Sequence, residues 1–167
     1  MQVRKAKHEE LDAILGIYET ARCFMKETGN PTQWEGGYPP KELILEDIAG
    51  GHLYVLAEAD TLHGVFAFFP EGDPAYDALS ARWMNALPYA AIHRVASAGS
   101  KKGVLSACIA FCLSQAKNLK IDTHKDNRVM QAALLKLGFV PCGDADIPHV
   151  GMRLLYQLYK ETSYDQR

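Results

Sequence analysis

Two histidines occupy positions that suit proton transfer. His93 lies in the apolar run 89–96, and His124 directly follows the apolar run 119–123. Imidazole titrates near neutral pH, so either side chain can act as a general base. We take His93 as the first candidate for a catalytic residue and His124, beside Asp122, as the second. Burial between a sheet and a helix explains His93 equally well.

A short basic loop suits anion binding. The apolar run 89–96 is followed by a small, glycine-containing loop and then by a helical pattern that begins at Val104. The N-terminus of a helix presents unpaired amides and a positive dipole end, which favour phosphate groups. Gly99 and Gly103 permit close backbone approach, and Lys101 and Lys102 supply positive charge. An ordinary turn with solvated lysines is the other interpretation.

Four aromatic side chains are candidates for lining a pocket. Trp34 and Tyr38 lie in the loop 31–40, which is rich in glycine and proline, while Trp83 and Tyr89 precede or begin the central apolar run. Aromatic rings bind apolar amines and stack on cationic ones. Core packing explains each of them too. Trp34 is our first candidate for substrate contact because its loop offers little else to pack against.

These residues require a scaffold of alternating strands and helices. Hydrophobic periodicity and breaker residues predict one order of elements along the whole chain, with residues 77–87 left as a loop or short helix. The expected strands are 3–5, 52–59, 62–69, 89–96, 119–123, 139–142 and 152–159, and the expected helices follow residues 8, 42, 104 and 127. The pattern therefore predicts one α/β domain with a mixed sheet, residues 1–167.

Composition excludes several classes of protein. The 167 residues carry a net charge of −2, which gives no overall basic surface for nucleic acid. No apolar run reaches the roughly 20 residues that span a bilayer, and the N-terminus lacks a signal-peptide pattern, so we expect a cytoplasmic protein without membrane contact. The four cysteines form no disulfide or zinc pattern, and neither Cys112 nor Cys142 has an evident base partner. We expect no metal.

Several stretches together resemble the GNAT (N-acetyltransferase) superfamily across nearly the whole chain. They are IHRVA at 92–96, KGV at 102–104, DTHKDN at 122–127 and LKLGF at 135–139. The resemblance implies a mixed, mostly antiparallel sheet of six or seven strands, flanked by helices, with splayed central strands. It also implies acetyl-CoA as cosubstrate and direct attack by an amine on the thioester, without a covalent enzyme intermediate or a metal.

The resemblance also implies a cofactor site. Val95, Ala96 and Ser97 would hold the pantetheine arm like an added strand. The pyrophosphate would lie at the loop and the first helical turn, which comprise Ser100, Lys101, Lys102, Gly103, Val104 and Leu105. Asn127 would contact the pantetheine, although it also suits a helix N-cap. His93 is similar in place to the catalytic histidine of the arylalkylamine acetyltransferases.

Three positions depart from the family pattern. Ser100 stands where Gln or Arg is usual, Leu105 replaces the second glycine of the loop, and Leu134 replaces a tyrosine that commonly protonates the departing thiolate. These departures raise an alternative hypothesis, a non-catalytic CoA-binding or regulatory module. A further alternative is a site for another phosphate ligand in a generic α/β fold.

The sequence leaves the binding partners open. A small-molecule amine or a peptide amine would fit as acceptor, and polyamines, amino acids, aminoglycosides and protein N-termini all stay possible. We expect no nucleic acid partner. Residues 154–159 would suit an exposed strand edge, which predicts a homodimer through that edge.

Overall fold

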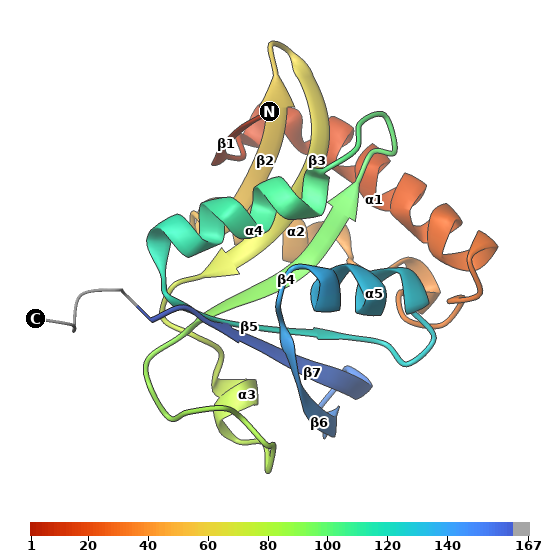
Figure 1. Ribbon diagram of the computed structural model, residues 1–167. Coiled ribbons are helices and arrows are strands. Elements are labelled where there is room, and N and C mark those ends of the chain that lie inside the picture. The colour runs from red at the N-terminus through yellow and green to blue at the C-terminus, as the bar shows by residue number, and fades with distance from the viewer. Residues whose placement is uncertain (162–167) are drawn as a thin grey trace, which may run out of the picture.

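A seven-stranded sheet runs through the structure, a computed structural model that describes residues 1–161 (Figure 1). Among the strands of the described residues, only β4 and β5 pair in parallel, and the other neighbouring strands are antiparallel. The strand order is β1 (Gln2–Lys5), β2 (Leu53–Glu58), β3 (Thr61–Phe69), β4 (Ala90–Ser97), β5 (Asn118–Thr123), β7 (Gly151–Tyr159) and β6 (Val140–Ile147). The predicted mixed, mostly antiparallel sheet is confirmed.

Helices cover both faces of this sheet. Helices α1 and α2 lie on one face and α4 and α5 on the other (Figure 1). The apolar side chains of α1 and α2 pack against β2, β3 and β4, and those of α4 and α5 pack into the cluster on the opposite face. The helices are η1 (His8–Glu10), α1 (Leu11–Glu27), η2 (Glu35–Gly37), α2 (Lys41–Ala49), α3 (Pro74–Asp77), α4 (Val104–Gln115) and α5 (Arg128–Lys136). Helix α4 is the crossover that the parallel β4–β5 pair requires.

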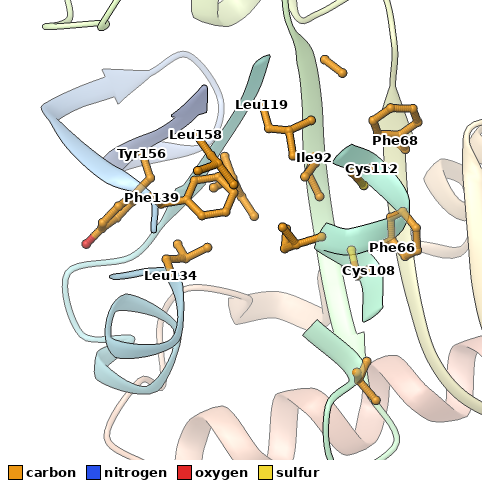
Figure 2. Packing of buried hydrophobic residues seen from close by; sticks show 14 of the residues in the cluster. Phe66, Phe68, Ile92, Cys108, Cys112, Leu119, Leu134, Phe139, Tyr156 and Leu158 are labelled. Atoms are coloured by element: carbon orange, nitrogen blue, oxygen red, sulfur yellow. The ribbon is translucent and has the colours of Figure 1, made fainter. Parts of the chain in front are cut away.

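The core beneath α4 and α5 joins the two halves of the sheet (Figure 2). Ile92 of β4 and Leu119 of β5 meet Cys108 and Cys112 of α4 there, and Leu134 of α5 packs into the same cluster. Both cysteines are fully buried, and burial raises the pKa of the Cys108 thiol well above its usual value. These cysteines therefore act as packing groups.

The two central strands part after three residue pairs. Ala90, Ala91 and Ile92 pair with residues 119–121 of β5, and from His93 onward β4 diverges from β5 (Figure 1). Opposite β3 the register also shifts, because Arg94 adopts a left-handed φ of 53° within the strand. Such a bulge bends the strand and frees backbone groups. The expected splay of the central strands is confirmed.

One local expectation was wrong. Residues 154–159 do not form an edge, because β7 lies between β5 and β6, and β6 occupies the edge instead. For residues 77–87 the loop alternative is confirmed, because the short helix before β4 is α3, which ends at Asp77. No helix within residues 1–161 is long and apolar enough to cross a bilayer.

Candidate active site

A cavity of about 540 Å³ opens where β4 and β5 part. Its walls come from segments far apart in the sequence: the end of α1, the loop 32–38, the start of α3, the gap itself, α5 and the β6–β7 turn. Polar side chains that line it include Asp73, His93, Asp122, Asn127 and Arg153. A concave, partly apolar cavity with a few convergent polar groups is the usual form of a small-molecule site.

His93 lies between two carboxylates. Its Nε2 donates to Asp73 Oδ2 at 2.8 Å, and its Nδ1 lies 3.8 Å from Asp122 Oδ2. The hydrogen bond from His93 lowers the pKa of Asp73, so that carboxylate stays charged and accepts the Nε2 proton. In the neutral imidazole this leaves Nδ1 as the basic atom. The arrangement is that of a general base oriented by a carboxylate.

Asp73 and Asp122 are both fixed by neighbouring groups. Asp73 caps α3 by accepting from the Ala75 amide at 2.8 Å, and the Tyr89 hydroxyl lies within 3.1 Å of both its backbone nitrogen and its carbonyl oxygen. Tyr76 donates its hydroxyl to Asp122 Oδ2 at 2.5 Å. Burial and the nearby carboxylate raise the pKa of Tyr76, so its hydroxyl stays protonated as a donor.

The bulge in β4 is anchored by a buried ion pair. Arg94 donates from Nε and Nη2 to the two carboxylate oxygens of Asp47 on α2, at 3.0 Å each. Tyr18 of α1 donates to the Arg94 carbonyl at 3.0 Å. Burial raises the pKa of Asp47 more than Arg94 lowers it, so the pair adds little net stability although breaking it is costly. Helices α1 and α2 thus hold the strand in its bent form.

The basic loop leads into a helix start that suits an anion. Gly103 is the N-cap residue of α4 with a φ of 82°, and no side chain within residues 1–161 bonds the amides of the first turn. Gly64 of β3 allows this turn to lie close to the sheet, because a Cβ there would come within 2.4 Å of Val104 Cγ1. The backbone amides after Gly103 are therefore available to a ligand.

Two side chains of that loop already have partners. Ser100 Oγ lies 2.8 Å from His63 Nδ1, and Lys101 forms an ion pair with Glu58, which also binds the N-terminal amino group. These cations lower the pKa of the exposed Glu58 carboxyl to about 2. Lys102 and Gly103 are exposed. The main chain of this loop, more than its lysines, is presented for binding.

Asn127 caps α5, as its second interpretation predicted. Its Oδ1 accepts from the Met130 amide at 3.0 Å, and its Nδ2 donates to Gln33 at 2.9 Å across the cavity wall. Leu134 on the same helix is fully buried beside Phe139 (Figure 2). The position where a tyrosine is usual in the family therefore faces the core, away from the cavity lining.

His124 does not reach the cavity. Its Nδ1 accepts from the Asp126 amide at 3.1 Å, and its Nε2 lies 3.5 Å from the Thr32 hydroxyl. Burial and Arg153 lower its pKa. The structure thus gives His124 a role in the turn before α5 and brings only His93, of the two candidate bases, to the cavity lining.

The aromatic candidates separate into two groups. Trp34 and Tyr38 line the cavity, and Trp34 also packs against Tyr18 with ring centroids 5.7 Å apart. Trp83 instead lines a second hollow, where the Lys120 ammonium lies 4.1 Å from its ring centroid. Trp34 therefore serves packing as well as the cavity, and Trp83 lies outside the cavity lining.

Four residues that build this site were not among the sequence candidates. Asp73, Tyr76 and Arg153 line the cavity, and Asp47 anchors the bulge beneath it. An N-cap Asp before Pro, as in Asp73-Pro74, is a helix-start signal in the sequence. That signal would locate α3 but not its contact with His93, which is 20 residues away in sequence.

Comparison with known proteins gives one clear family. The sequence matches no protein-family model and no curated protein. Among solved structures, it is 33% identical to a GNAT-family acetyltransferase from Streptococcus agalactiae, with a TM-score of 0.81 and 96% of each chain covered. A GNAT-family acetyltransferase from Listeria monocytogenes is 20% identical, with a TM-score of 0.71 over 95% of this chain and 94% of that one.

A more distant structure shares the fold alone. A ribosomal-protein-alanine N-acetyltransferase from Brucella melitensis is 15% identical with a TM-score of 0.63, covering 96% of this chain and all of that one. The similarity to the Streptococcus agalactiae acetyltransferase extends over nearly the whole chain. The parted central strands agree with the fold expected for that family. The chain belongs to the GNAT family of acetyltransferases.

Proposed function

We propose that the protein transfers the acetyl group of acetyl-CoA to a primary amine by direct attack. The observation that carries this proposal is the parting of β4 from β5 beside His93. The start of α4 follows one end of the open part of β4, and His93, the candidate base, lies at the other end in the cavity. Membership of the family supports acetyl transfer in general.

The residues of the gap fit acetyl-CoA. Among residues 1–161, the backbone of Val95, Ala96 and Ser97 has no pairing partner on the β5 side, so it suits an extended pantetheine arm. The uncapped first turn of α4 suits the pyrophosphate. When bound, acetyl-CoA supplies an activated thioester carbonyl. We call the segment from Val95 to Leu105 the cofactor side of the site.

The acceptor side is the cluster of His93, Asp73, Asp122, Tyr76 and Arg153. An amine attacks only when it is neutral, and most amines are protonated at neutral pH. His93 Nδ1 accepts that proton, while Asp73 holds the ring and its tautomer. Asp122, fixed by Tyr76, attracts the ammonium form and lies 3.8 Å from the basic nitrogen. The bulge at Arg94 interrupts the regular pairing of β4 beside the gap, and backbone amides freed there would suit a developing oxyanion.

Release of free CoA in the presence of primary amines tests this proposal. The purified protein is incubated with acetyl-CoA and a panel of amines, with mass spectrometry of the products. We expect amide formation and CoA release that depend on both substrates. CoA binding without transfer to any amine would favour the regulatory alternative. Binding of ATP or NAD, with no binding of CoA or acetyl-CoA at millimolar ligand, would contradict both.

A further inference from the structure

Arg153 is a buried cation on the acceptor side that takes no part in the proton transfer and amine attack proposed for this site. It lies on β7, is only 8% exposed and lines the cavity. Its Nη1 donates to the Met152 carbonyl at 2.9 Å and its Nη2 to the Gln33 carbonyl at 3.3 Å. A guanidinium has five N–H donors, so these two bonds leave some of its donors without a hydrogen-bond acceptor among the described residues.

The ionisable groups His93, Asp122 and Arg153 lie in that order along the acceptor side. Asp122 lies between His93 and Arg153: its Oδ2 is 3.8 Å from His93 Nδ1, and its Oδ1 is 3.7 Å from Arg153 Nε. Both separations exceed a direct hydrogen bond, so Asp122 does not saturate either partner. An ammonium beside Asp122 and a carboxylate beside Arg153 would each meet an opposite charge, and the two positions are neighbours.

We propose that the acceptor is a free α-amino acid, whose carboxylate binds Arg153 and whose amino group lies between Asp122 and His93. This inference rests on the proposed acetyl transfer. Arg binds carboxylates with a planar pair of donors, and burial strengthens such a contact. The rings of Trp34, Tyr38 and Phe69 line the same cavity and fit an apolar amino-acid side chain. A peptide N-terminus has an amide where the free carboxylate would be.

Acetyl transfer starts from the ammonium form of the amino acid. One proton of the ammonium leaves through His93 Nδ1, and the nitrogen then bonds to the acetyl carbon as the C–S bond breaks. A second proton from nitrogen ends on the CoA sulfur. The products are an N-acetylamino acid and CoA, with one proton released to solvent.

Matched substrates test the role of the carboxylate. Acetylation is measured for L-leucine against isopentylamine and leucinamide, and for L-phenylalanine against phenethylamine and phenylalaninamide. We expect kcat/KM at least about tenfold higher for each amino acid, because only it pairs with a buried guanidinium. An amine or amide that is accepted as well as its amino acid would overturn the inference and leave amine acetylation itself intact.

The variant Arg153→Gln tests whether Arg153 is the group that binds the substrate carboxylate. The variant should raise KM for the amino acid and bring the ratio of kcat/KM for amino acid and amine close to one, while Arg153→Lys restores part of it. Arg82→Gln is the control, because Arg82 is exposed and lies outside both hollows. Thermal melts check that each variant is folded.

Calorimetric binding separates this inference from the proposed reaction. L-leucine and L-phenylalanine are titrated into the CoA-saturated protein. Binding that Arg153→Gln removes supports the inference even where no product forms, in which case only the proposed reaction fails. Absence of binding, or equal binding by the variant, contradicts it.

Discussion

The cofactor side and the acceptor side flank the same gap but are built differently. The cofactor side is one continuous segment, Val95 to Leu105, and it offers mainly backbone groups at a strand end and a helix start. The acceptor side brings together side chains from β4, α3, β5 and β7. Backbone recognition therefore tolerates side-chain changes such as Leu105, whereas a side-chain network depends on each member.

His93→Ala should break the acceptor side alone and have the largest effect. Loss of the base should lower kcat about 10²- to 10⁴-fold, because general-base catalysis contributes that much. CoA release at saturating acetyl-CoA measures the change. Since the His93 side chain is not part of the cofactor side, the Kd of acetyl-CoA should stay within about twofold; a lost cofactor affinity would contradict the separation of the two sides.

Asp73→Asn should disable His93 without removing it. Asn can still cap α3 through its carbonyl, but its NH₂ would then face His93 Nε2 and force the proton onto Nδ1. We expect kcat to fall about 10²-fold or more, as wrong-tautomer changes do in hydrolase triads. An unchanged rate would show that Asp73 does not orient the base.

The ionisation of Asp73 also makes the stability of the fold depend on pH. The hydrogen bond from His93 lowers its pKa below the ordinary 3.8, so its charged form stabilises the native state above that pH. This stability is lost as the pH falls through the lowered value. Urea unfolding between about pH 5 and pH 2 should therefore show a shallower acid loss in Asp73→Asn than in the wild type.

Asp47→Ala should disturb both sides, because it frees the bulge that they share. Arg94 would keep a buried charge without a partner, which costs about 3 kcal/mol in the free energy of unfolding. Urea denaturation measures this loss. Glu19→Ala removes an exposed carboxylate that pairs with Arg22, and solvent screening should make its effect on stability much smaller. Equal effects of the two would contradict the anchoring role.

Gly64→Ala should break the cofactor side alone. The added Cβ would lie 2.4 Å from Val104 Cγ1 and 3.1 Å from the Ala96 carbonyl oxygen, so α4 or β4 must move. We expect a loss of about 1–3 kcal/mol in stability and weaker acetyl-CoA binding. Gly16→Ala is the matched control, because nothing lies within 4 Å of its Cβ position in α1. That control should be neutral or slightly stabilising.

Glu58→Gln should change only the affinity of the cofactor side for acetyl-CoA, and its effect should be the smallest. The substitution releases Lys101 from its ion pair, so this lysine becomes available to phosphate groups at the start of α4. We expect acetyl-CoA to bind about two- to threefold more tightly at low salt, with the difference fading at about 1 M salt. Calorimetry at the two salt concentrations measures this. Weaker binding would mean that Glu58 organises the loop for the cofactor.

The same contrast explains what the sequence could predict. Local periodicity located the sheet, the crossover α4 and the N-cap Asn127, because each depends on neighbouring residues. The contact of Asp73 with His93 and the series from His93 to Arg153 depend on how distant elements pack, so no local pattern revealed them. His124 and Trp83 had suitable chemistry in sequence, but the fold turns both away from the cavity lining.

Titration of acetyl-CoA into His93→Ala and Gly64→Ala, side by side with the wild type, is the most direct test of the two-sided account. The account predicts a wild-type Kd for His93→Ala, although this variant turns over poorly, and a clearly raised Kd for Gly64→Ala. Equal affinities for both variants, or a loss of binding confined to His93→Ala, would contradict it.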